Sequence, residues 1–237
     1  MLVLALDTTS EKGGVGIYRD LDCLASVANE GPANIYSISL FEMVERALGQ
    51  VKLGLGDVDL FAVANGPGSF TGIRVGLAAT QAWAKAFSRP AGAVSLLEAL
   101  VEEARPETDW AVPILDARRG EFFVEIFRRL PPGTTSSQGP FTAEEEGWVV
   151  RPPGLVPFLA ERLPAGVTCL VREHEQAALA LRDNLPNSYG WQCVPGTLVG
   201  AISRLALKAH QQGRTEPPAV LDAYYIRRPD AELNWRE

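Results

Sequence analysis

Apolar runs separated by short polar turns predict alternating strands and helices in the first half of the chain. Leu2 to Leu6 is apolar at every position, as expected of a strand that is covered on both faces. Further strands are predicted at Val15 to Tyr18, Leu24 to Asn29, Leu60 to Ala64 and Gly92 to Val94. With helical stretches between them, these strands predict an α/β fold.

Two stretches have the periodicity of long helices. Tyr36 to Leu48 carries one wide apolar stripe. From Gly72 to Phe87, polar side chains fall only on a narrow strip formed by Arg74, Gln81 and Lys85. We therefore expect the second helix to be covered twice, by the sheet and by a partner that also contacts the first helix. The residues predicted for this interface are Tyr36, Leu40, Phe41, Met43, Val44, Leu48, Gly72, Ile73, Gly76, Ala79 and Trp83.

Between the strand Leu60 to Ala64 and the second helix lies a turn rich in glycine. Gly66 and Gly68 permit positive φ around Pro67, and Ser69 or Thr71 is predicted to cap the helix. Free N–H groups at a helix N-terminus favour an anion. The turn lacks the Gly-Lys-Ser/Thr of a Walker loop and the spacing of a dinucleotide fingerprint. An anion site and a tight corner that binds nothing are both compatible with the sequence.

The second half of the chain has shorter and less regular patterns. Fourteen of the 17 prolines follow Arg105, which predicts an N-terminal lobe over 1–105 and a reduced α/β lobe over 106–237. Ser95 to Glu98 has the spacing of a capping box. Strands are predicted at 110–115 and 122–127, helices at 155–163 and 198–212, an exposed loop at 131–147 and an exposed tail at the C-terminal end.

Composition excludes several classes of protein. The chain has 237 residues, 46% of them hydrophobic, a formal charge of −7 and a pI near 5.0. This acidic balance opposes unaided binding to nucleic acid. Three scattered cysteines and two isolated histidines predict neither a disulfide framework nor a metal site, and a reducing cytoplasm fits. We expect no signal peptide and no membrane-spanning segment.

The stretch Gly-Pro-Gly-Ser-Phe-Thr-Gly-Ile-Arg-Val-Gly, residues 66–76, closely resembles the signature of the bacterial TsaB (YeaZ) family. Asp-Ala-Arg-x-Gly-Glu at 116–121 and a C-terminal Tyr-x-Arg element are similar to further family motifs. The family-motif residues are Arg74, Asp116, Arg118, Gly120, Glu121, Tyr225 and Arg227. Asp116, Arg118 and Glu121 are expected either to pair around their turn or to meet another subunit. Ala33 to Ser37 departs from the His-Ser/Thr common in the family, which leaves the contacts of the first helix open.

The start of the chain, Leu2 to Ser10, resembles the actin, sugar-kinase and Hsp70 (ASKHA) superfamily, in which this turn faces phosphate and metal. The resemblance implies an actin-like lobe with a mixed sheet. It also marks a degenerate phosphate site, since no recognisable adenosine-binding half or substrate pocket accompanies Asp7. The candidate residues of that site are Asp7, Thr8, Thr9, Ser10, Gly66, Gly68 and Ser69.

The family resemblance implies a non-catalytic scaffold or activator subunit of the tRNA threonylcarbamoyltransferase complex. A TsaD-like subunit would supply the chemistry and a TsaE-like ATPase would reset the complex. No cofactor is expected in this chain, whereas ATP and a metal ion are expected in the partner subunits. The chain is expected to pair with TsaD, to form a homodimer when alone, and to contact tRNA only through the complex. A small-molecule kinase of the same superfamily is the main alternative, and a glycoprotease-like hydrolase is the weaker one.

Overall fold

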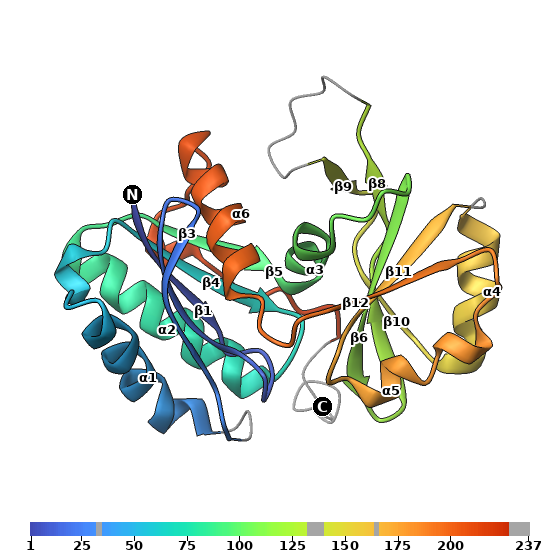
Figure 1. Ribbon diagram of the computed structural model, residues 1–237, viewed down its shortest axis with the longest axis horizontal. Coiled ribbons are helices and arrows are strands. Elements are labelled where there is room, and N and C mark those ends of the chain that lie inside the picture. The colour runs from blue at the N-terminus through green and yellow to red at the C-terminus, as the bar shows by residue number, and fades with distance from the viewer. Residues whose placement is uncertain (32–34, 132–139, 164–165, 228–237) are drawn as a thin grey trace, which may run out of the picture.

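The computed structural model describes residues 1–31, 35–131, 140–163 and 166–227. Figure 1 shows two lobes side by side, each built around a sheet. The departure from the family pattern at Ala33 and Asn34, most of the predicted loop at 131–147 and the tail after Arg227 lie outside the described residues.

The first sheet has five strands in the order β3-β2-β1-β4-β5. Its central strand β1 pairs antiparallel with β2 and parallel with β4, so the sheet is mixed as predicted. The strands are β1 (Leu2–Asp7), β2 (Gly14–Arg19), β3 (Asp22–Ala28), β4 (Leu60–Gly66) and β5 (Ala91–Ser95).

Helices cover both faces of this sheet, which explains the uninterrupted apolar run in β1. Leu2, Leu4 and Leu6 point into a core shared with α1 (Tyr36–Gln50) and α2 (Phe70–Phe87). Val3 and Ala5 point to the opposite face, into a core shared with α3 (Leu96–Ala104) and α6 (Val199–Gln211). Alternate residues of one strand therefore serve two cores.

The second lobe repeats the strand arrangement of the first. Its main path is β10-β7-β6-β11-β12, with antiparallel pairs β6/β7 and β7/β10 and parallel pairs β6/β11 and β11/β12. These strands are β6 (Trp110–Arg118), β7 (Glu121–Val124), β10 (Trp148–Val150), β11 (Val167–Arg172) and β12 (Gly190–Val194). The two five-strand paths thus match in order and direction, although the sequence shows no repeat.

Smaller elements complete this lobe. The predicted strand at 122–127 is interrupted, because the chain leaves β7 after Val124 and resumes in β8 (Phe127–Arg129). β8 pairs with β6 and with β9 (Phe141–Ala143). The other elements of this lobe are α4 (Pro152–Arg162), α5 (Gln176–Leu179) and the 3-10 turn η3 (Arg182–Asn184). The 3-10 turns η2 (Leu55–Asp57) and η4 (Pro218–Val220) pack against α2.

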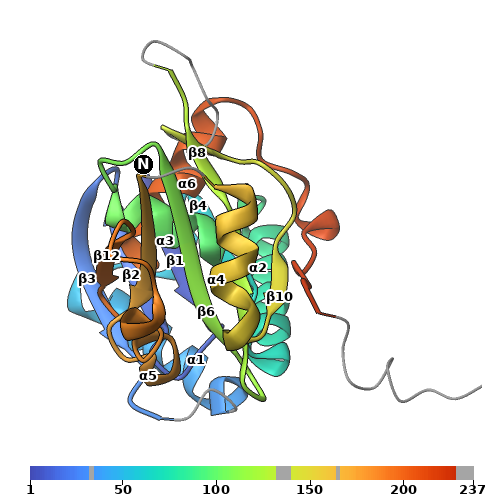
Figure 2. The same cartoon turned by 90° about the vertical axis from the view of Figure 1, so that its right-hand side faces the viewer.

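The C-terminal helix returns to the first sheet. α6 packs against β1, β2, β4 and β5 and against α3, as Figure 1 shows by its place in the first lobe. The following segment with η4 lies along α2, on the side of the molecule seen in Figure 2. A division at residue 105 therefore does not describe where these segments pack, and the domain boundary stays a prediction.

Of the two predicted helix N-caps, the structure confirms the one at α2 and contradicts the one at α3. Ser69 caps α2, its Oγ accepting a hydrogen bond from the Gly72 N–H at 3.2 Å. The capping box predicted at Ser95 is wrong, because Ser95 precedes α3 without a side-chain capping bond. Its Oγ is buried without a partner among the described residues. No helix within the described ranges is long and apolar enough to cross a membrane.

Candidate interlobe site

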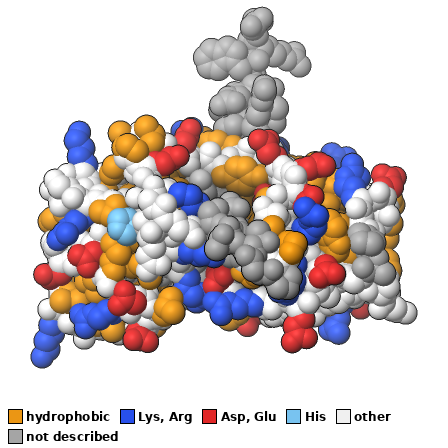
Figure 3. Space-filling model, turned by 90° about the horizontal axis from the view of Figure 1, so that it is seen from above, with side chains coloured by type: hydrophobic (Ala, Val, Ile, Leu, Met, Phe, Trp, Pro, Cys, Tyr) orange, Lys and Arg blue, Asp and Glu red, His pale blue; other side chains and the backbone are white. Residues whose placement is uncertain are grey.

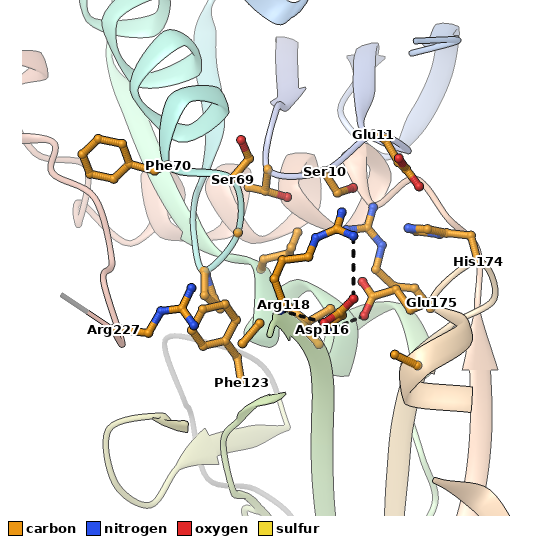
Figure 4. Close-up of a pocket in the computed structure, with 18 of the residues that line it drawn as sticks. Ser10, Glu11, Ser69, Phe70, Asp116, Arg118, Phe123, His174, Glu175 and Arg227 are labelled. Atoms are coloured by element: carbon orange, nitrogen blue, oxygen red, sulfur yellow. Dashed lines mark hydrogen bonds and ion pairs between the residues drawn. The ribbon is translucent and has the colours of Figure 1, made fainter. Parts of the chain in front are cut away.

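A cleft of about 420 Å³ lies between the lobes, where the carboxyl ends of strands from both sheets face each other. From the first lobe, the turn after β1 and the turn before α2 supply Thr9, Ser10, Gly68 and Ser69. Figure 4 shows Ser10 and Ser69 on one side of the cleft and Asp116, Arg118 and Glu175 on the other.

The two turns of the first lobe are held together by the backbone. Ser69 N–H donates to Thr9 O at 2.7 Å, and Thr8 Oγ1 donates to Gly72 O at 2.7 Å. A Cβ on Gly68, whose φ is +157°, would lie 2.5 Å from Thr9 O. The glycine of this turn is thus required by the close approach of the β1 turn, which the sequence pattern alone did not indicate.

Asp7, the predicted phosphate and metal residue, faces an arginine instead. Its side chain is fully buried and does not line the cleft. Asp7 Oδ1 accepts hydrogen bonds from the Thr9 N–H at 3.0 Å and from Thr9 Oγ1 at 2.6 Å. Asp7 Oδ2 forms an ion pair with Arg172 Nη2 at 3.3 Å. Of the predicted phosphate-site residues, Thr8 and Gly66 also lie outside the cleft lining.

Arg172, from the end of β11, was not predicted by the sequence analysis. It is fully buried, and its Nε and Nη2 both donate to Gly196 O, the first at 2.9 Å. Its Nη1 has no partner among the described residues, and Arg172 lines the cleft. The only signal was an arginine directly after the mostly apolar stretch Val167 to Val171.

Two titratable residues after Arg172 also line the cleft. Burial, together with the charges of Arg172 and Lys12, lowers the pKa of His174 to about 4, so this imidazole is neutral at pH 7. Burial raises the pKa of Glu175, whose Oε2 accepts the Asp116 N–H at 2.8 Å. Among the described residues, no group of three or more His, Cys, Asp or Glu side chains is placed to hold a metal ion.

The Asp-Ala-Arg-x-Gly-Glu turn makes the expected local contact and also a long-range contact within this chain. Asp116 Oδ1 accepts the Arg118 N–H at 2.7 Å, which is a local interaction around the turn. Glu121 instead reaches the C-terminal element, with Arg227 Nη1 at 3.0 Å from its Oε2. Gly120 has φ of +70° and completes the turn.

The C-terminal Tyr-x-Arg element also contacts the start of α2. Arg74 Nε donates to Tyr225 Oη at 3.2 Å, and its guanidinium lies 3.8 Å from the centre of the Phe70 ring. The rings of Phe70 and Tyr225 stack with centroids 5.4 Å apart. Family-motif residues that are about 150 positions apart in the sequence are therefore neighbours.

The predicted partner interface on α1 and α2 needs a correction. Of its eleven residues only Phe41 is exposed, at 55%, whereas the other ten are buried within this chain. Gly72 and Gly76 face the β1 turn, where a Cβ on either residue would overlap Thr8. Their small size thus allows close packing inside the lobe, and they do not face a partner helix. The exposed apolar residues of α1 are Phe41 and Ile38, the latter 80% exposed.

Comparison with known proteins supports the family resemblance. A family model described as TsaD, tRNA N6-adenosine threonylcarbamoyltransferase, matches residues 33–131. Curated relatives described as tRNA threonylcarbamoyladenosine biosynthesis protein TsaB come from Bacillus subtilis (33% identity; 54% of this chain, 56% of the relative) and Escherichia coli (28%; 64% and 63%). The matched region thus spans somewhat more than half the length of these relatives.

Solved structures match over nearly the whole chain. A Pseudomonas aeruginosa protein described as similar to the peptidase YeaZ gives a TM-score of 0.72 at 24% identity, covering 95% of this chain and 99% of that one. YeaZ from Pseudomonas aeruginosa gives 0.71 at 22% identity, covering 94% and 100%. These likenesses show that the chain shares the fold of the YeaZ structures, in agreement with the predicted α/β class. Sequence relatives and fold both support membership of the TsaB (YeaZ) family.

Proposed function

We propose that this chain is a non-catalytic subunit in the biosynthesis of threonylcarbamoyladenosine on tRNA. It would bind a TsaD-like subunit, which carries the metal, ATP and chemistry, and would work with a TsaE-like ATPase. Family membership is the observation that carries this proposal, since the curated relatives are described as biosynthesis proteins for this nucleoside.

The interlobe site supports a role without catalysis. A kinase of this superfamily needs a carboxylate that is free to bind magnesium, whereas Asp7 is committed to Arg172 and Thr9. A hydrolase would need an activated nucleophile, but Ser69 Oγ accepts the hydrogen bond that caps α2. These contacts favour the subunit over both alternatives.

We expect the exposed side of α1 to bind the TsaD-like subunit, with Phe41 as an anchor. Its ring packs edge-on against Trp83 with centroids 5.6 Å apart, so it is held in place while half exposed. Phe41→Arg should weaken binding of TsaD from the same organism at least tenfold, because a charge would be buried in an apolar contact. Isothermal titration calorimetry measures the affinity, and transfer of threonylcarbamoyl to tRNA measures activity.

Leu21→Arg is the matched control for Phe41→Arg. Leu21 is 69% exposed in the turn between β2 and β3, outside α1 and α2, and we expect this variant to bind TsaD normally. If folded Phe41→Arg binds TsaD with unchanged affinity, the interface lies elsewhere. If the wild-type chain fails to bind TsaD at all, the proposed function itself is wrong.

The chain alone is expected to bind tRNA weakly at physiological salt. Its formal charge is −7, and Figure 3 shows basic and acidic side chains interspersed on one face. Phosphate contacts by Lys and Arg supply most non-specific affinity for nucleic acid, and acidic neighbours oppose them. Fluorescence anisotropy with labelled tRNA at several salt concentrations tests this expectation. Tight, salt-sensitive binding without TsaD would contradict a tRNA contact made through the complex.

A further inference from the structure

A second cavity, of about 380 Å³, lies between the lobes and shares no lining residue with the interlobe cleft. Asn65 from the end of β4 and Ser95 from the end of β5 form one wall. Glu125, in the break between β7 and β8, forms another. The complete lining is Asn65, Ser95, Glu98, Glu125, Phe127, Ala143, Glu144, Glu145, Glu146 and Tyr224.

The charge of this lining is entirely acidic. It contains five glutamates and no lysine, arginine or histidine. Glu144 is paired with Arg128 at 2.6 Å, whereas Glu125 is only 6% exposed and makes no ion pair with any described residue. A buried carboxyl group either takes up a proton or has its charged form stabilised by a cation, so the acidic lining favours a positively charged group.

Three oxygen atoms of the lining are buried without a hydrogen-bond partner among the described residues. They are Glu125 Oε2, Asn65 Oδ1 and Ser95 Oγ. The carboxylate and amide oxygens only accept hydrogen bonds, and the serine oxygen accepts as well as donates. Three unpaired acceptors around one cavity therefore call for a donor with several N–H or O–H groups.

The titration of Glu125 and Glu98 agrees with this geometry. Burial raises the pKa of Glu125 to about 8, and the charges of Glu98 and Glu146 add to the increase. Burial raises the pKa of Glu98 to about 7. Glu102 from α3 raises this pKa further, while Arg214 and Lys208, from the α6 region, oppose the increase. A bound cation would restore both carboxylates to their charged form.

We propose that this cavity binds a primary alkylammonium group, held by Glu125 together with the side-chain oxygens of Asn65 and Ser95. An ammonium group has three N–H donors and no acceptor, which matches the three unpaired oxygens. Phe127, Ala143 and Tyr224 provide apolar and aromatic walls for the alkyl chain. The volume falls within the range of small-molecule sites. The proposal is independent of the proposed function.

A small amine fits this lining better than a divalent metal. Hard cations such as Mg²⁺ and Ca²⁺ require six or more oxygen ligands in a tight shell. The described residues contain no group of three or more His, Cys, Asp or Glu placed to hold a metal ion. The cavity also has space and apolar surface that a bare ion does not use.

Calorimetric titration of the full chain with 1,4-diaminobutane at pH 8 tests the proposal. We expect saturable binding to the wild type and at least tenfold weaker binding to Glu125→Gln, which removes the buried charge but keeps the shape. Glu45→Gln is the matched control, since it removes an exposed charge on α1, outside this lining, and should leave binding unchanged. 1-Butanol, which has the chain without the charge, should not bind.

Equal binding of the amine to the wild type and Glu125→Gln, or no binding to either, would overturn the proposal. If Mg²⁺ binds in a Glu125-dependent way and displaces the amine, the cavity is a metal site and the proposed amine site is wrong. Neither result depends on whether TsaD binds, so failure here leaves the proposed function untouched.

A stability measurement separates loss of binding from loss of folding in Glu125→Gln. The pKa of Glu125 is raised in the folded state, so the wild type loses stability as pH rises from about 4.5 to about 8. Glu125→Gln should therefore unfold at higher urea than the wild type at pH 8, and at about the same urea at pH 4. A variant that is less stable than the wild type at pH 8 would show that the carboxylate is satisfied within the chain, contrary to the proposal.

Discussion

Arg172→Met is expected to destabilise the fold by about 3–5 kcal/mol, the cost of leaving one member of a buried ion pair without its partner. Both Arg172 and Asp7 are fully buried, and their contact joins β11 of the second sheet to β1 of the first. In the variant, Asp7 keeps its bonds from Thr9 but loses the cation. The urea midpoint, monitored by circular dichroism, measures the loss.

Two further variants show whether the unpaired charge is the cause. The double variant Asp7→Asn/Arg172→Met should recover much of the lost stability, because removing both charges of a buried pair costs little. Arg118→Met is the control for loss of an arginine at the same cleft. Its ion pair with Asp116 spans 3.8 Å and its side chain is 72% exposed, so we expect a change below about 1 kcal/mol. Equal effects of the two single variants would refute this account of Asp7 and Arg172.

Gly76→Leu is expected to prevent normal packing of the first lobe, with a loss of about 3 kcal/mol or more. A Cβ at position 76 would overlap Thr8 Oγ1 and lie 3.1 Å from Val63 Cγ2. Thr8 cannot move away freely, since its hydroxyl is bonded to Gly72 O. The apolar pattern of α2 predicted Gly76 at a partner interface, where a leucine would leave the chain folded, and the structure reverses that expectation.

Gly76→Ala gives a sharper test, because helix propensity and steric overlap predict opposite changes in the free energy of unfolding. Helix propensity alone would make Gly76→Ala stabilising by about 1 kcal/mol. Overlap with Thr8 makes the same change destabilising. Gly49→Ala is the matched control in α1, where no atom lies within 4 Å of the added Cβ, and it should stabilise the protein by up to about 1 kcal/mol. Urea unfolding measures the stability of both variants. If Gly76→Ala is destabilised, Gly76 is packed inside the lobe; if it is stabilised like Gly49→Ala, Gly76 lies on an open face of α2.

The local elements of the fold were largely predictable. The apolar run of β1 and the periodicity of α1 and α2 indicated their type and approximate ends, because burial on one or two faces imposes a repeat on neighbouring residues. Ser69 was identified as a cap from its place before the helix. The capping box predicted at Ser95 does not form, because the spacing of residues does not determine whether the serine hydroxyl turns toward the helix or into a cavity.

The sites were less predictable because they join distant segments. Apolar periodicity showed that α1 and α2 carry wide apolar faces, but it could not show that the chain itself covers ten of the eleven predicted interface residues. No sequence motif marked Glu125 as a residue of a site. Its burial follows from the break between β7 and β8, which places a residue of the second lobe against the ends of β4 and β5.

Apolar periodicity and turn chemistry were enough to predict the α/β pattern and the turn of residues 66–76, and that turn carries the resemblance to the TsaB (YeaZ) family. The common topology of the two sheets and the contact of Asp7 with Arg172, 165 residues away along the chain, are visible only in the folded protein. The physical reason is that hydrophobic periodicity and turn chemistry act between neighbours in the sequence. Ion pairs and close backbone contacts depend instead on which elements the completed fold brings together, and diverged lobes leave no repeat to reveal this.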